Sequence, residues 1–202
     1  MQKKAQITIE EKLSVLDAEN SNKYLEEMLL KNKIAFSKSY VQNISLENDI
    51  TLLTEKGIHK QIIDSNDHSS HFSEIFTKKN ISLFESYSAS LSIPSDAISY
   101  SINEENGDVS ITYNKEDIDI FSVEITNSTF IENNIFYRSY NKTEYEATKS
   151  IGLQEIKKEF KSEKNLEKAN ESLIKFLVKD AKNHGIPKVI INGEPYNLTF
   201  LS

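Results

Sequence analysis

Apolar side chains in the first part of the chain recur with the period of an amphipathic helix. The clearest set shares the i, i+1, i+4, i+5 spacing of one helical face and comprises Tyr24, Leu25, Met28 and Leu29. Thr8 and Glu11 form a capping-box pattern, so we expect a helix to begin there, to weaken at 20–22 and to end near Lys33. The helical spacing recurs at Ile58, Ile62 and Ile63 and again at Phe72, Ile75 and Phe76. The sequence therefore predicts a helical region over 1–81.

From about Ser95 the apolar residues alternate with polar ones, which is typical of strands with one buried face. This alternation predicts strands at 98–102, 109–113, 121–125 and 135–140. Asn106-Gly107 is a preferred hairpin turn between the first two, so we expect an antiparallel β-meander. The serine-rich stretch 82–94, which ends at Pro94, is the expected connection between the helical region and this sheet.

The C-terminal part returns to the helical period and then to strands. Thr143 and Glu146 form a second capping box, and apolar positions predict one helix over 143–160 and another over 166–181. Gly185 followed by Pro187 is a helix stop signal. Short strands at 189–191 and 196–200 flank Asn192-Gly193 and predict a closing β-hairpin.

Runs of helices and runs of strands that are segregated along the chain indicate an α+β fold. We predict a helical N-terminal half (1–81), an antiparallel meander in the middle, two C-terminal helices and a closing hairpin. Residues 95–202 would form the α+β region, and the whole chain would form either two regions or one single domain.

The 202-residue chain has no cysteine, so disulfides, thiolate nucleophiles and sulfur-ligated zinc sites are excluded. A net charge of −7 disfavours nucleic-acid binding, which needs clustered basic residues. We find neither a secretory signal nor an apolar run that could span a bilayer. We therefore expect no membrane association and a cytoplasmic protein, or one delivered to a host cell without a cleaved signal. A bacterial or phage origin would fit the scarcity of arginine, since Arg138 is the single arginine among 24 basic residues.

Two clusters of charged and ligand-type residues suggest metal chemistry. His68 and His71 could share a helix face with Glu74 and hold a transition metal, although the polar segment around them also fits a solvated loop. The acidic run of Glu116, Asp117, Asp119 and Glu124 could chelate magnesium as in metal-dependent nucleases. Glu124 is followed by Ile125 and Thr126 rather than a lysine, so solvated strand and turn positions explain these acids better. We predict no bound metal and no cofactor.

Arg138 stands at the end of a predicted strand, within Phe136-Tyr137-Arg138-Ser139, and Thr143-Glu144-Tyr145 and Gly152 follow. This arrangement resembles the first motif of ADP-ribosyltransferases, in which a strand-end Tyr-Arg precedes a short helix and a glycine. The resemblance implies that Arg138 would bind NAD and that Phe160-Lys161-Ser162 would stand for the later aromatic-x-Ser strand. Glu194 would then be the candidate for the catalytic glutamate. The alternative is that Arg138 pairs with an acid such as Glu124 or Glu132 across the sheet.

Aromatic residues on or near the predicted meander are too many for one face, so some must point outward. Outward tyrosines on an acidic sheet would suit the binding of a basic protein, although helices could instead cover both faces. We therefore predict a non-catalytic interaction protein of inhibitor, immunity or effector type, with an NAD-dependent ADP-ribosyltransferase-like enzyme as the alternative. The expected partner-binding residues are Tyr113, Asp117, Asp119, Glu124, Tyr137 and Arg138.

Overall fold

The structure, a computed structural model, describes residues 2–64, 80–132 and 142–198. Its elements in chain order are α1 (Gln2–Ser45), β1 (Asp49–Asp64), β2 (Asn80–Pro94), η1 (Ser95–Ala97), β3 (Ser99–Ile102), β4 (Val109–Thr112), η2 (Lys115–Asp117), β5 (Asp119–Glu132), α2 (Lys142–Phe160), α3 (Glu163–Asn183), β6 (Lys188–Ile191) and β7 (Glu194–Asn197). The predicted α+β class is confirmed, with an N-terminal helix, an antiparallel sheet, two C-terminal helices and a closing hairpin.

The chain forms two compact units, each assembled from separate segments. Unit 1 contains 1–48, 95–113 and 174–202, and unit 2 contains 49–94 and 114–173. The boundary at 173/174 falls inside α3. The apolar positions predicted for this helix are Leu166, which is half-buried, and four fully buried residues, Ala169, Leu173, Leu177 and Ala181.

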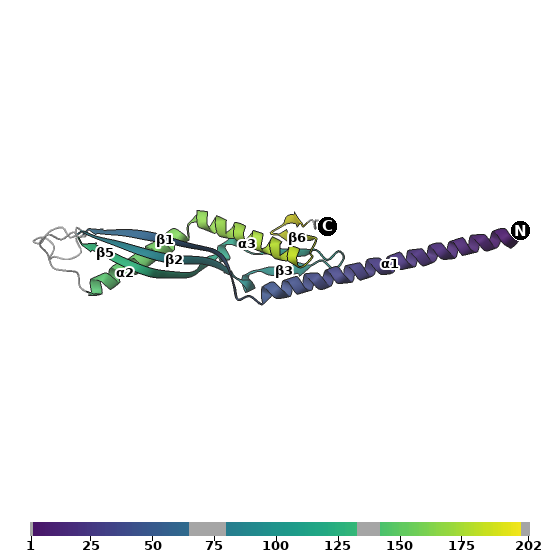
Figure 1. Cartoon of the computed structure of the whole chain (residues 1–202), viewed down its shortest axis with the longest axis horizontal. Helices are drawn as coiled ribbons and strands as arrows, with labels where there is room; N and C mark the ends of the chain where they lie inside the picture. The colour runs from purple at the N-terminus through teal and green to yellow at the C-terminus, as the bar shows by residue number, and fades with distance from the viewer. Residues whose placement is uncertain (1, 65–79, 133–141, 199–202) are drawn as a thin grey trace, which may run out of the picture. The chain divides into compact units, whose positions relative to one another are not determined.

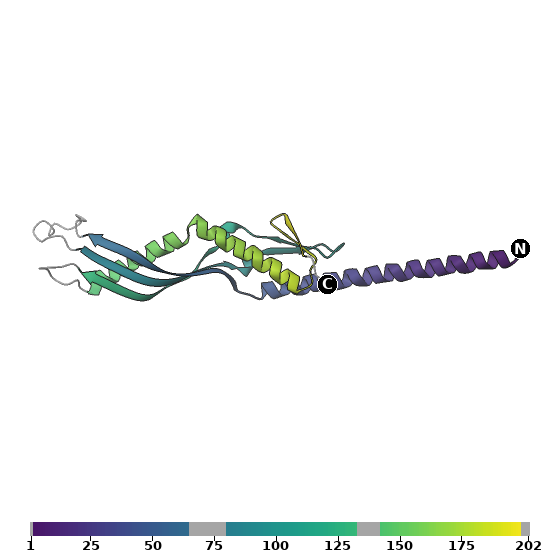
Figure 2. The same cartoon turned by 45° about the horizontal axis from the view of Figure 1, so that its top comes forward.

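In unit 1 the C-terminal part of α1 lies beside the β3–β4 hairpin and α3 (Figure 2). Ser37, Tyr40 and Ile44 are buried along one side of the helix at the i, i+3, i+7 spacing of a packed face. The Ser37 hydroxyl donates to the Gly107 carbonyl (2.7 Å), and the Tyr40 hydroxyl donates to the Leu177 carbonyl (2.9 Å). These two buried hydrogen bonds fix α1 on the hairpin and on α3.

The sheet of unit 1 has the strand order β3-β4-β6-β7, and β4 pairs with β6 in parallel while the two hairpins are antiparallel. Asn192 and Gly193 both have positive φ (49° and 88°), as a tight two-residue hairpin turn requires. The predicted stop of α3 is also confirmed. Gly185 has φ 72°, and Ile186 N–H bonds to the Ala181 carbonyl at 3.0 Å, which is a Schellman cap.

Unit 2 contains a three-stranded antiparallel sheet of order β1-β2-β5, with β2 in the centre. Helix α2 runs along one face of this sheet (Figure 1). At the start of α2, the Tyr145 ring meets the Phe130 ring of β5 edge to face, at a centroid distance of 4.3 Å. Further along α2, Ile156 and Phe160 are buried. The helix therefore covers the sheet through a stripe on one side only.

Several local predictions for the first half are wrong. Helix α1 continues from Gln2 to Ser45, so it neither starts at Thr8, breaks at 20–22 nor ends near Lys33. The predicted helix around Ile58 is strand β1, because isoleucines spaced by four residues share a face in a strand as well as in a helix. The predicted connection 82–94 belongs to the central strand β2, where its serines alternate with apolar residues.

The predicted meander is only partly correct. The β3–β4 hairpin forms as expected, but β5 pairs with β2 instead of β4. The partner of β4 is β6 from the closing hairpin. Pairing between strands far apart in sequence leaves no local turn signal, which is why alternation alone could not reveal it. The predicted strand 135–140 and the predicted helical repeat at Phe72 and Phe76 lie outside the described residues.

Candidate functional site

Strand β1 of unit 2 turns His59 and Gln61 toward α2, and Ile58 and Ile62 away from it. His59 bonds to Glu155 of α2, and the Gln61 oxygen lies near Gly152 of α2. Because side chains alternate along a strand, Ile58 and Ile62 project from the opposite face. Two polar side chains of β1 therefore lie under the helix, on the same face as the buried Leu83 and as Phe130, which packs against Tyr145.

Cross-strand pairs extend this arrangement over the whole sheet. Directly paired residues lie on the same face, so the register defines rows across β1, β2 and β5. The rows on the side away from α2 are Ile58–Ser86–Asn127, Lys60–Phe84–Thr129 and Ile62–Ser82–Ile131. We call these nine residues the open face.

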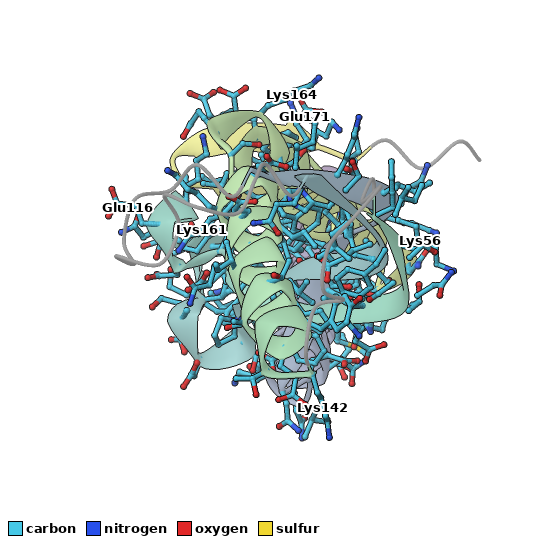
Figure 3. All side chains as sticks on the ribbon, turned by 90° about the vertical axis from the view of Figure 1, so that its left-hand side faces the viewer. Lys56, Glu116, Lys142, Lys161, Lys164 and Glu171 are labelled. Atoms are coloured by element: carbon cyan, nitrogen blue, oxygen red, sulfur yellow. The ribbon has the colours of Figure 1, made fainter. Side chains whose placement is uncertain are left out.

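The open face exposes large apolar side chains. The exposed fractions are 72% for Ile58, 62% for Ile62 and 47% for Ile131. Phe84 is half-buried at the centre, with the Lys60 ammonium 5.6 Å from its ring centroid. A neighbouring row pairs Lys56, Ser88 and Glu124, and Figure 3 shows Lys56 projecting outward on the side away from α2. The open face is thus an apolar patch bordered by side chains of both charges.

The opposite face of the same sheet buries a polar cluster under α2. Glu85 of β2 is fully buried and pairs across the strands with His59 and Ser128. A Cβ built on Gly152 would meet the Glu85 carboxylate, with Gln61 3.5 Å away, so the helix backbone lies directly over this carboxyl group. Among the described residues, no hydrogen-bond donor reaches either Glu85 oxygen or Gln61 Oε1.

His59 connects this cluster to the exposed side of α2. Its Nε2 is 3.1 Å from Glu155 Oε2, and its Nδ1 is 3.7 Å from Glu159 Oε2. Burial raises the pKa of the Glu85 carboxyl, and Glu155 adds to that effect, whereas His59 and Lys149 oppose it.

The predicted binding residues that the structure describes are divided between the two units. Tyr113 follows β4 in unit 1 and is half-buried, and its N–H donates to Asn192 Oδ1 (3.0 Å). Burial, with a smaller effect from Tyr196, raises the pKa of Tyr113 to about 12. The acidic residues Asp117, Asp119 and Glu124 belong to unit 2.

Those three acids occupy different settings. Asp117 is exposed in η2. Asp119 opens β5 and forms an ion pair with Lys161 (2.9 Å), which with the Ile120 backbone N–H lowers its pKa. Glu124 is exposed on β5 in the row beside the open face. Only Glu124 therefore adjoins the apolar patch.

The remaining predicted candidates, Tyr137, Arg138, His68 and His71, lie outside the described residues. Phe160 ends α2 and Lys161-Ser162 form the turn to α3, so the strand implied by the ADP-ribosyltransferase resemblance is not found there. Glu194 is exposed at the start of β7. Within the three described segments, no group of three or more acidic or histidine side chains is arranged to hold a metal ion.

Comparison with known proteins found no matching family model, no matching curated protein and no matching solved structure. Across 2–64, 80–132 and 142–198, no helix combines the length and the apolar character needed to cross a bilayer.

Sequence reasoning did not identify the open face or the buried Glu85. Ile58 and Ile62 were assigned to a helical face, and Glu85 lay in the presumed connection. The available signal was the alternation of serine with Leu83, Glu85 and the residues that follow, which marks a strand with two different faces.

Proposed function

We propose that this protein is a non-catalytic interaction module that binds a basic protein partner through the open face of the β1-β2-β5 sheet. The observation that carries the proposal is the exposure of Ile58, Ile62 and Ile131 on the side of this sheet that faces away from α2. Large exposed apolar side chains gathered on one face of a sheet are characteristic of interaction surfaces.

Burial of the patch supplies a reasonable driving force. Covering the exposed part of an isoleucine contributes about 1–2 kcal/mol, and Ile58, Ile62 and Ile131 each leave about half or more of their surface accessible. On the central strand of this face, Phe84 lies between the small side chains of Ser82 and Ser86, so a large apolar side chain stands between two low positions. This arrangement favours a partner with its own apolar anchors.

Electrostatics supports a basic partner. The net charge of −7 attracts positive proteins over long range and accelerates their association at low salt. Close to the open face, Lys56 and Glu124 flank Ser88, so local charges of both signs would set the orientation of the bound partner. We therefore expect salt to slow association, while removal of apolar contacts would accelerate dissociation.

Site-specific photo-crosslinking in cells tests this proposal. A photoreactive residue at Ile58 or Ile131 is expected to capture the same partner protein. Ile151 is the matched control position, because it is an isoleucine of unit 2 that is 48% exposed on α2. Equal capture from Ile151, or no protein adduct from either open-face position, would contradict the proposal.

Substitutions on the open face then show which interactions contribute to partner binding. Once the partner is purified, Ile58→Asp should weaken binding at least tenfold, about 1.4 kcal/mol, whereas Ile151→Asp should leave binding unchanged. Glu124→Lys should reduce the association rate and its salt dependence. If neither Ile58→Asp nor added salt changes the affinity for the partner, the open face is not the binding surface.

A further inference from the structure

The buried carboxyl group of Glu85 lies among hydrogen-bond acceptors, and it can form a hydrogen bond with them only if it carries a proton itself. Within the described residues, three buried acceptor atoms lie close together under α2 without any donor: Oε1 and Oε2 of Glu85, and Oε1 of Gln61. An ionised carboxylate in this position would be both desolvated and unpaired, which is very unfavourable. One proton on Glu85 removes the charge and provides an O–H that can donate to the Gln61 oxygen.

Apolar side chains of α2 pack on the sheet on either side of this group, at Tyr145 and at Ile156, but not directly above it. The stripe of α2 that faces the sheet carries Thr148 and Gly152 at this level, whereas Ile151 points outward and is 48% exposed. Gly152 leaves room for the carboxyl only because it has no Cβ. Seating of α2 at this level therefore depends on how the buried carboxyl group is accommodated beneath Gly152.

We propose that Glu85 is protonated in the folded protein and that its ionisation releases the Thr148–Ile156 part of α2 from the sheet. We call this segment of α2 the latch: it packs on the sheet when Glu85 is neutral and separates from the sheet when Glu85 is charged. The latch concerns the helix-covered face of the sheet and goes beyond the binding role proposed for the open face.

The charged groups around Glu85 act on its pKa in both directions: Glu155 raises it, whereas His59 and Lys149 lower it. His59 faces Glu85 from β1, Ser128 faces it from β5 without charge, and α2 contributes Lys149 and Glu155. Glu159 lies behind His59. Burial is the largest influence and raises the pKa of Glu85. Because the pKa is raised in the closed state, the stabilisation from the proton is complete at low pH and is lost as pH rises through the folded-state value.

Amide hydrogen exchange of α2 measured from about pH 5 to about pH 8 tests the latch. After correction for intrinsic exchange, protection of the amides between Thr148 and Ile156 should fall with rising pH, by up to about tenfold per pH unit for one linked proton. Glu85→Gln keeps the shape and adds a neutral donor, so its protection should stay high and independent of pH. Glu155→Gln and His59→Gln are the controls, and both should retain the pH dependence.

Flat protection in the unmodified protein, or an unchanged slope in Glu85→Gln, would overturn the proposal. A direct measurement covers the case in which Glu85→Gln does not fold. Carbon NMR of the unmodified protein should show the Glu85 carboxyl still protonated at a pH where an ordinary exposed glutamate is ionised. Titration of Glu85 in the ordinary range of an exposed glutamate would exclude the latch.

Discussion

Replacement of Gly152 by alanine measures how tightly α2 is seated on the Glu85 carboxyl. The new Cβ would lie only 3.1 Å from Glu85 Cδ and closer still to Oε2, and Glu85 is fully buried with no room to swing toward solvent. Gly152 has no positive φ, so the backbone itself accepts alanine. The substitution therefore has two opposing effects: the added Cβ clashes with the Glu85 carboxyl group, and alanine raises the helix propensity of the position.

The two effects have opposite signs and can be separated. Alanine in a helix interior is about 1 kcal/mol more stable than glycine, whereas overpacking a filled site costs about 1–3 kcal/mol. We expect Gly152→Ala to lower the free energy of unfolding by about 1 kcal/mol in the unmodified protein. In a Glu85→Ala background the conflict is gone, and the same substitution should raise stability by about 1 kcal/mol. The coupling free energy between the two sites is then about 2 kcal/mol.

Urea unfolding followed by far-ultraviolet circular dichroism provides the assay, with the four proteins of the double-mutant cycle compared at one pH. Ala147→Gly, at an exposed position of the same helix, measures the propensity effect alone and should cost about 1 kcal/mol. If Gly152→Ala stabilises the unmodified protein as much as it stabilises the Glu85→Ala variant, the Glu85 carboxyl group does not lie against α2.

Three further predictions concern other contacts. Tyr40→Phe removes the hydrogen bond to the Leu177 carbonyl and should cost about 1 kcal/mol in urea unfolding; no loss would mean that this bond does not anchor α1. Gly107→Ala combines φ 76° with a Cβ contact of 2.9 Å to Lys33 and should cost about 1–3 kcal/mol, and an unchanged unfolding midpoint would contradict it. The lowered pKa of Asp119 means that its ion pair with Lys161 stabilises above the ordinary carboxyl pKa and is lost as pH falls through the folded-state value. Lys161→Ala should therefore flatten the acid limb of the stability profile, and an identical limb would refute the pairing.

The sequence alone determined the elements whose signals are local. The stop of α3 at Gly185 follows from the left-handed cap conformation that glycine adopts readily, and the β6–β7 hairpin follows from Asn192-Gly193. The apolar face of α3 could be read because Leu166 and Ala169 are three residues apart, a spacing that shares a face in a helix but not in a strand. Of the expected binding residues, the chain pattern placed Glu124 correctly on a strand.

The tertiary structure decided the pairing of distant segments and the meaning of the isoleucines near residue 60. Spacings of four residues are shared by helices and strands, so Ile58 and Ile62 were ambiguous until β1 was seen to pair with β2. Hydrophobic patterning also presumes that apolar side chains face the covering element. In unit 2 that presumption holds only in part, because Glu85 and His59 lie beside Leu83 under α2 while Ile58 and Ile62 face outward, and only three-dimensional packing shows which face of a strand a helix covers.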